Sequence, residues 1–204
     1  MDNHFRVAIF GSARIKKDDW EYKIIYQLGK MLAQESISLV TGGGPGLMDA
    51  ASRGHHAGKG NNNVHSVGLT IILPHETKEQ RAFHLDIQQD FERFSSRLDS
   101  FMEYSHAVIV APGGVGTLLE LFYTWQLVQV KHICDMPIIL MGPMWKGLVD
   151  WIRTHPMRKN LLSESDVDRL FVAQGVKETI DLIKKAKMAY EEGKHVCHSL
   201  AGYR

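Results

Sequence analysis

The 204-residue sequence has few cysteines, no excess of charge of either sign and no long apolar run. Its two cysteines, Cys134 and Cys197, form neither a disulfide framework nor a CxxC pair. Lys and Arg number 24 against 23 Asp and Glu, a net charge of +1, so no basic field favours nucleic acid as a partner. No apolar run approaches membrane-spanning length and no signal peptide opens the sequence. We therefore expect no membrane partner and, by default, a cytoplasmic location.

Several motifs of nucleotide and acyl chemistry are also missing. The glycine-rich stretch 42–46 does not match G-x-G-x-x-G followed by an acidic residue about 20 positions later. The Gly-Lys-Ser/Thr of a Walker A loop is absent, and so is the G-x-S-x-G of a nucleophile elbow. These absences remove the best sequence signals for dinucleotide binding, for ATP hydrolysis and for a serine nucleophile.

Short apolar runs alternate with longer segments of helical spacing. The runs typical of strands cover about 5–10, 37–40, 64–73, 107–111, 136–141 and 170–172. The segments typical of helices cover about 20–34, 47 onward, 91–105, 118–130, 145–153 and 176–192. The alternation predicts an α/β fold, an open parallel sheet with helices on both faces. We expect one domain over residues 1–192 and a tail over residues 193–204.

The stretch from Pro112 to Glu120 carries the strongest functional signal. The apolar run 107–111 leads into three glycines within four residues, and a helical segment follows. Glycines let backbone N–H groups approach a ligand, and a helix N-terminus adds partial positive charge. The turn therefore predicts a phosphate site. The residues expected to bind the phosphate are Gly113, Gly114, Val115, Gly116 and Thr117.

Glu120 lies in a helical segment that is apolar on nearly all sides. Such a helix is typical of burial, here between the sheet and a second subunit. A carboxylate in that setting needs a partner or a function. Arg97, at the edge of the apolar stripe of the helix predicted over 91–105, is the candidate partner. It could instead extend to water, and Glu120 could instead lie on a solvated helix face beyond an ordinary tight turn.

A second unit of strand, glycine turn and helix lies earlier in the chain, around residues 42–46. Ligands of open parallel sheets bind at the carboxyl ends of the strands, and both glycine turns follow such ends. We therefore expect the two turns to face one pocket. The substrate-binding residues assigned to its opposite wall are Ser12, Gly43, Gly44 and Met48. A purely structural turn would use the same glycines.

The histidines give no metal signal. We expect His55 and His56, which follow the first glycine helix, to be exposed in a loop rather than to act as ligands. The cluster His195-Val196-Cys197-His198 matches no zinc spacing and lies in a tail without periodicity. We accordingly assign no metal site and no cofactor.

Three motifs resemble those of the LOG, or Lonely guy, family of phosphoribohydrolases. They are Thr41-Gly-Gly-Gly-Pro-Gly-Leu-Met48, Arg97-Leu-x-x-Phe101 and Pro112-Gly-Gly-Val-Gly-Thr-x-x-Glu120. The resemblance runs from Phe5 to about Leu140, and many members of the family carry an old lysine decarboxylase label. It implies a Rossmann-like homodimer that cleaves the N-glycosidic bond of nucleoside 5′-monophosphates. The products would be a free base and ribose 5-phosphate.

The arginine motif differs from the common family form Arg-Lys-x-x-Met. Arg97-Leu98-x-x-Phe101 followed by His106 is more similar to the bacterial pyrimidine/purine nucleotide 5′-monophosphate nucleosidases. The resemblance therefore favours AMP and other nucleotides over a strict preference for cytokinin riboside 5′-monophosphates.

The chemistry of N-glycosidic hydrolysis suits these residues, since a carboxylate stabilises the positive charge that develops on the sugar. In this hypothesis Glu120 is catalytic, and Arg97 orients it and contacts the substrate, without a metal or an organic cofactor. The alternative is a non-catalytic nucleotide sensor or a carrier of a phosphorylated cofactor. Such a protein would need the phosphate turn but not the Arg97–Glu120 pair.

Overall fold

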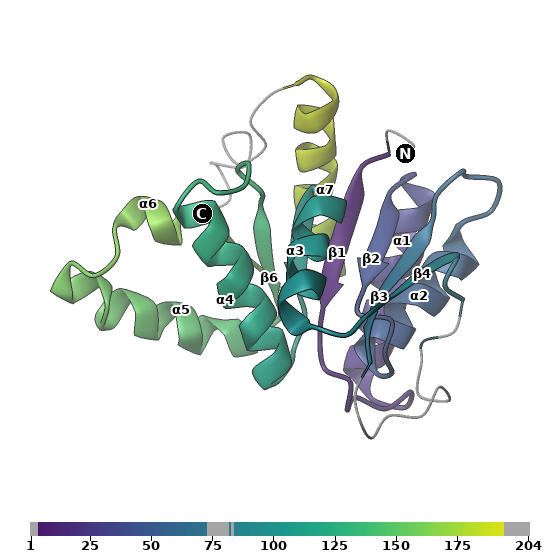
Figure 1. Ribbon diagram of the computed structural model, residues 1–204, viewed down its shortest axis with the longest axis horizontal. Coiled ribbons are helices and arrows are strands. Elements are labelled where there is room, and N and C mark those ends of the chain that lie inside the picture. Colours follow the sequence, from purple (N-terminus) through teal and green to yellow (C-terminus); the bar gives the residue numbers. More distant parts are fainter. Residues whose placement is uncertain (1–3, 73–81, 83, 194–204) are drawn as a thin grey trace.

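The computed structural model describes residues 4–72, 82 and 84–193 (Figure 1). These residues form one seven-stranded parallel sheet in the order β4-β3-β2-β1-β5-β6-β7, with helices on both faces, so the predicted α/β fold is confirmed. The strands are β1 (Arg6–Phe10), β2 (Ser38–Thr41), β3 (Ser66–Ile71), β4 (Ile87–Phe91), β5 (Ala107–Val110), β6 (Ile138–Met141) and β7 (Leu170–Ala173). The helices are α1 (Trp20–Gln34), α2 (Leu47–Gly58), α3 (Phe94–Tyr104), α4 (Val115–Gln129), α5 (Met144–Thr154), the 3₁₀ turn η2 (Met157–Lys159), α6 (Glu164–Val167) and α7 (Val176–Glu191).

The order of the strands reverses beside β1. From β1 the chain builds β2, β3 and β4 toward one edge of the sheet, and then returns to place β5 on the other side of β1. In open α/β sheets, ligands bind beyond the carboxyl ends of the strands at such a switch point. The turns that follow β1 and β5 are therefore the ones that the topology places at a binding crevice.

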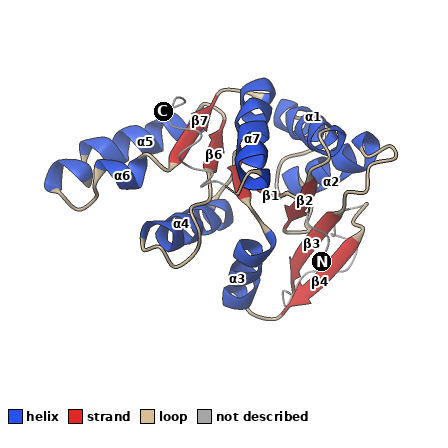
Figure 2. Cartoon of the chain, turned by 90° about the horizontal axis from the view of Figure 1, so that it is seen from above, coloured by secondary structure: helices blue, strands red, loops and turns tan. Residues whose placement is uncertain are grey.

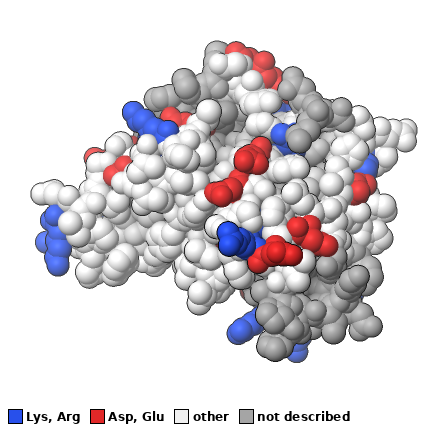
Figure 3. Space-filling model, viewed as in Figure 1, with Lys and Arg blue, Asp and Glu red and all other residues white. Residues whose placement is uncertain are grey.

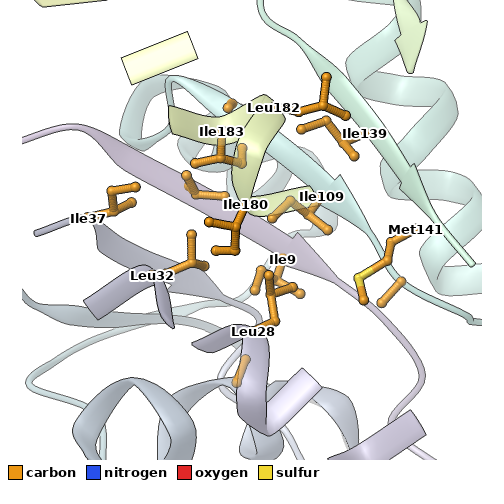
Figure 4. Packing of buried hydrophobic residues seen from close by; sticks show 14 of the residues in the cluster. Ile9, Leu28, Leu32, Ile37, Ile109, Ile139, Met141, Ile180, Leu182 and Ile183 are labelled. Atoms are coloured by element: carbon orange, nitrogen blue, oxygen red, sulfur yellow. The ribbon is translucent and has the colours of Figure 1, made fainter. Parts of the chain in front are cut away.

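Two apolar cores lie on opposite faces of the sheet. Figure 2 shows α1, α2 and α7 on one side of the sheet and α3 and α4 on the other. Successive strand residues point to opposite faces, so Ile9 belongs to one core and Phe10 to the other. The first core packs α1, α2 and α7 on the sheet, as Figure 4 shows for Leu28, Ile109 and Ile183. The second core lies under α3, α4 and α5. Because both faces are covered at the centre of the sheet, the strands β1, β5 and β6 are apolar, as in other parallel sheets.

Helices α1 and α2 pack against each other at backbone contact distance. A Cβ on Gly54 of α2 would lie 1.9 Å from the carbonyl oxygen of Tyr26 on α1, so only glycine fits there. The next residue, His55, is fully buried, and its Nε2 donates a 2.9 Å hydrogen bond to the Ile37 carbonyl. Burial lowers the pKa of His55. The prediction that His55 is exposed in a loop is wrong, because α2 continues to Gly58 and turns this side chain toward the sheet.

The sequence did not predict β4. Its first four residues, from Ile87 to Asp90, are exposed at the edge of the sheet, and three of them are polar, so no apolar run marked the strand. The helix predicted over 91–105 starts at Phe94, and the helix predicted from Leu118 starts at Val115, with Gly116 in its first turn. The cluster 195–198 lies entirely outside the described residues.

None of the helices in the described ranges combines the length and the apolar character needed to cross a bilayer.

Candidate active site

Three strand-to-helix turns are tied together at the carboxyl edge of the sheet. The Ser12 N–H, after β1, donates a 3.0 Å hydrogen bond to the carbonyl of Pro112, after β5. The Ser12 carbonyl in turn accepts a 2.9 Å bond from the N–H of Leu47, at the start of α2. Gly46 approaches Ser12 closely at φ +69°, and a Cβ there would lie 2.3 Å from the Ser12 carbonyl oxygen. The turns after β1, β2 and β5 thus form a single hydrogen-bonded rim.

This rim borders a cavity of about 850 Å³, which is within the usual range for small-molecule sites. The walls come from the three turns, from the ends of β3 and β4, and from side chains of α2, α3 and α4. The sequence-predicted site residues that line it are Ser12, Gly43, Gly44, Met48, Arg97, Gly114, Val115, Gly116, Thr117 and Glu120. The two glycine turns therefore do face one pocket, as their positions after parallel strands predicted.

The glycines of the turn after β5 have two different reasons to be glycine. Gly113 is not among the lining residues, and a Cβ on it would lie 2.1 Å from Oγ1 of the buried Thr117. Gly114 and Gly116 line the cavity, and a Cβ on either would meet no protein atom within 4 Å. Neither of these two has a positive φ. The protein itself therefore does not require glycine at 114 and 116, and the space beside them is open to a ligand.

The N-terminus of α4 lies in the cavity wall. The helix starts at Val115, Gly114 gives it no side-chain cap, and the first of its N–H groups to bond within the helix is that of Leu118, which donates to the Gly114 carbonyl at 3.0 Å. The N–H groups of Val115, Gly116 and Thr117 precede that bond, in the turn where helices lack internal acceptors. A helix end of this kind carries a partial positive charge and attracts an anion.

Arg97 is held in the cavity wall from several sides. Its Nε donates a 2.7 Å hydrogen bond to the carbonyl of Leu69 in β3, and its Cζ lies 5.2 Å from the centre of the Phe101 ring. A Cβ on Gly42 would lie 2.2 Å from Nη2, so the turn after β2 leaves room for the guanidinium only because it has glycine there. Arg97 is 8% exposed. The alternative in which Arg97 extends to water is therefore wrong.

Glu120 faces this guanidinium. Its Oε1 lies 3.8 Å from Nη1 of Arg97, so the pair expected from the sequence is present. Burial raises the pKa of Glu120 to about 7, and the positive charge of Arg97 acts in the opposite direction. A carboxyl group in this state has both protonated and ionised forms near neutral pH, which is the condition under which general acid–base catalysis is most effective.

Several cavity residues carried no signal in the sequence. They are Arg14 after β1, Thr70, Ile71 and Ile72 at the end of β3, and Asp90 in β4. Asp90 accepts hydrogen bonds from the Thr70 hydroxyl and, at 2.8 Å, from Nε2 of Gln88. Because the sequence of β4 is mostly polar, neither the strand nor the position of Asp90 in the cavity wall was predicted. Arg14 could be seen in the sequence as a basic residue, but no motif around it indicated that it would line a cavity.

His106, which carried part of the sequence resemblance, lies elsewhere. Its Nδ1 accepts a 3.0 Å hydrogen bond from the backbone N–H of Arg6, and its ring stacks on Phe5. Burial lowers the pKa of His106 to about 4. His106 is thus a neutral packing residue between β1 and α7. Within the described residues, no three metal-binding side chains come together.

The family model described as "Possible lysine decarboxylase" matches residues 48–183. The chain belongs to this family. The matched range contains the turn after β5, Arg97 and Glu120.

Among curated proteins, the chain is 29% identical over 195 residues to the pyrimidine/purine nucleotide 5′-monophosphate nucleosidase of Escherichia coli K12. That match covers 88% of this chain but 41% of the relative. The chain is also 30% identical over 143 residues to a cytokinin riboside 5′-monophosphate phosphoribohydrolase of Arabidopsis thaliana, over 67% of this chain and 61% of the relative. The chain thus matches less than two thirds of the length of these relatives.

Among solved structures, the molybdenum cofactor binding protein of Rippkaea orientalis has a TM-score of 0.64 at 22% identity, covering 89% of this chain and 96% of that one. The molybdenum cofactor carrier protein of Chlamydomonas reinhardtii has a TM-score of 0.60 at 20% identity, covering 92% and 99%. At these identities the likeness establishes a shared fold.

Proposed function

We propose that this member of the family hydrolyses the N-glycosidic bond of nucleoside 5′-monophosphates, releasing a free base and ribose 5-phosphate. The observation that carries the proposal is the Glu120 carboxyl beside Arg97, with a side chain only 13% exposed, in the same cavity as a glycine turn at a helix N-terminus. The turn suits the anionic end of a substrate. The carboxyl suits a centre that becomes positively charged during the reaction.

The bond that breaks joins C1′ of the ribose to a nitrogen of the base. As this bond lengthens, its electron pair moves to the base and the sugar acquires oxocarbenium character. The ionised form of Glu120 stabilises that charge and accepts a proton from the water whose oxygen bonds to C1′. The departing nitrogen takes a proton from solvent, and Glu120 afterwards returns the proton of the attacking water to solvent. The net reaction consumes one water, and the products are the neutral base and ribose 5-phosphate.

Arg97 orients this carboxylate and contacts the sugar. Its guanidinium is fixed by the Leu69 carbonyl and the Phe101 ring, so it presents Nη1 to Glu120 without moving. Its charge also favours the ionised form of Glu120 against the effect of burial. Arg97 thus keeps part of the Glu120 population ready to act as a base at neutral pH.

The 5′-phosphate occupies the turn after β5 in this proposal. The N–H groups of Val115, Gly116 and Thr117 bind its oxygens, and the open space beside Gly114 and Gly116 receives it. Gly43, Gly44, Ser12 and Met48 form the opposite wall. The two relatives support a mononucleotide substrate, since by name both act on nucleoside 5′-monophosphates. Of the two, the name of the nucleosidase supports the broader range of substrates, which includes AMP and pyrimidine nucleotides.

The direct test is incubation of the protein with AMP, CMP, GMP and UMP, followed by chromatography of the free bases. We expect release from at least one of them, and loss of that release in Glu120→Gln, which keeps the shape of the side chain and removes its charge. If Glu120→Gln retains activity within about tenfold, roughly 1.4 kcal/mol of barrier, the assigned role is wrong. Binding of nucleotides without turnover would instead favour the sensor or carrier.

We further propose that the chain forms a homodimer through α3 and α4. Phe94 is 50% exposed, and on α4 Val115, Leu119 and Phe122 are 84%, 45% and 41% exposed. Few charged side chains lie over α4 in Figure 3. An apolar surface of this kind is stabilised by a second apolar surface. The cytoplasmic location stays a prediction from the sequence.

A further inference from the structure

Arg14 lies in the turn after β1, beside the turn that receives the phosphate in the proposed function. Strands β1 and β5 are neighbours at the switch point of the sheet, and the Ser12 N–H bonds to the Pro112 carbonyl across the two turns. The backbone N–H of Arg14 donates a 3.1 Å hydrogen bond to the Ser12 hydroxyl. Arg14 itself lines the cavity. Its backbone is therefore fixed to the phosphate turn through Ser12.

Two cations, Arg14 and Arg97, are found among the described residues that line the cavity. The guanidinium of Arg97 is engaged by the Leu69 carbonyl and by Glu120. Arg14 is exposed, and within the described ranges its guanidinium has no hydrogen-bond or ion-pair partner. One cation is thus committed to the carboxylate, and the other is available to a ligand.

The turn after β5, called here the phosphate turn, has less positive charge than a phosphate requires. A phosphate monoester carries a charge of about −1.5 to −2 near neutral pH, whereas a helix N-terminus is equivalent to about half a positive charge. The first turn of α4 contains Val115, Gly116 and Thr117 and has no basic side chain. The backbone groups alone therefore leave most of the charge of the phosphate uncompensated.

We propose that Arg14 closes over the 5′-phosphate as its side-chain clamp and makes the protein select nucleotides over nucleosides. The planar guanidinium binds two phosphate oxygens at once, which a lysine ammonium does not do. Arg14, in the turn after β1, then binds the phosphate, and Arg97, on α3, contacts the sugar. This inference rests on the proposed function, because it takes the phosphate to lie at the turn after β5.

The test compares Arg14→Ala with Lys17→Ala, a matched loss of one exposed cation from the same segment at a position that does not line the cavity. Binding of AMP, adenosine, ribose 5-phosphate and ribose is measured by calorimetry in the Glu120→Gln background, so that turnover does not interfere. We expect Arg14→Ala to weaken binding of AMP and ribose 5-phosphate by about tenfold to a hundredfold, as for a lost charge-assisted hydrogen bond. Adenosine should change by less than about twofold. Arg14→Lys should recover part of the loss.

The same variants give a kinetic readout in the active protein. Arg14→Ala should raise KM for AMP and leave kcat nearly unchanged, because the clamp acts on a group that does not react. Equal effects of Arg14→Ala and Lys17→Ala on AMP, or equal effects of Arg14→Ala on AMP and adenosine, would overturn the assignment of Arg14. Arg14-dependent binding of AMP without release of a base from any of the four nucleotides would overturn the proposed function alone. A protein that binds neither AMP nor ribose 5-phosphate would overturn both.

Discussion

The ionisation of Glu120 is set by the surroundings of its side chain. An exposed glutamate is fully ionised at neutral pH, but burial on α4 raises the pKa of Glu120 to about 7. Arg97, whose Nη1 lies 3.8 Å from the carboxyl, limits the rise without cancelling it. The chemistry of the site therefore depends on pH in the range where proteins usually work.

We expect the rate of base release to rise with pH through an acid limb centred near pH 7. The ionised carboxylate is the active form in the proposed mechanism, and the pKa of Glu120 is about 7. Arg97→Met should move the limb to higher pH, because removal of the cation removes the influence that lowers the pKa. The measurement is kcat/KM for AMP between pH 5 and 9. A limb that stays in place in Arg97→Met would assign it to another group.

The same burial should cost stability at high pH. Because the folded pKa is raised above the unfolded value, the unfolded chain ionises first, and stability falls as the pH rises from about 4.5 to about 7. Glu120→Gln removes this loss, so it should be more stable than the parent by about 3 kcal/mol at pH 8 and nearly equal to it at pH 4. Urea unfolding at both pH values measures the difference. Glu103→Gln, on an exposed position of α3, is the matched control and should change little at either pH.

The glycines of the phosphate turn allow a separation of folding from binding. Gly113→Ala should destabilise the fold by roughly 1–3 kcal/mol, because its Cβ would lie 2.1 Å from Thr117 Oγ1. Gly114→Ala should fold normally, because its Cβ meets no protein atom, but should weaken AMP binding by occupying the space of the phosphate. Thermal unfolding and calorimetry on the two variants give the comparison. Equal losses of stability would mean that Gly114 has a structural role.

The sequence predicted the central pair of the site but not its surroundings. Glu120 and Arg97 were predictable because a carboxylate in an apolar helix and an arginine beside an apolar stripe are each unfavourable unless paired. Arg14 was not, because an exposed arginine in a turn looks the same whether or not a cavity lies beside it. Its position depends on the strand order, which brings β1 beside β5 across about a hundred residues of sequence.

At the element scale, the contact between α1 and α2 requires glycine, because the two backbones lie too close for a Cβ. A Cβ on Gly54 would lie 1.9 Å from a carbonyl oxygen of α1, so Gly54→Ala should destabilise the protein by roughly 1–3 kcal/mol. Gly147 lies within α5 with no neighbour within 4 Å of a Cβ, so Gly147→Ala should stabilise it by about 0.5–1 kcal/mol. Urea unfolding of both variants measures the two opposite shifts. A neutral Gly54→Ala would show that α1 and α2 can separate at small cost.

The strands differed in how well their sequence patterns predicted them. Strands such as β5 and β6 are buried on both faces and read as apolar runs, so the sequence predicted them closely. The edge strand β4 is held by its pairing with β3 rather than by burial of its side chains, and a polar sequence suffices for that. The pairing partner of an edge strand is a property of the tertiary structure, and local periodicity does not contain it.

For the whole molecule, the exposed apolar side chains of α3 and α4 predict a concentration-dependent dimer. Leu119→Lys should shift the protein to monomer, because a charge would be buried in the interface. Met188→Lys on α7, also an exposed apolar position at 59%, is the control and should leave the assembly unchanged. Light scattering after size exclusion over a range of concentrations gives the mass. A parent protein that is monomeric at every concentration would contradict the proposed dimer.

The seven-stranded sheet gives the two ends of the cavity different capacities for change. At one end, the wall consists of main-chain groups in three turns that are hydrogen-bonded to one another. Replacing side chains there changes the wall little. At the other end, Thr70 and Asp90 stand on β3 and the edge strand β4, Ile72 directly follows β3, and side chains rather than main-chain groups form the wall. Under the proposed function, related chains could therefore come to accept a different base while keeping the same contacts to the sugar phosphate.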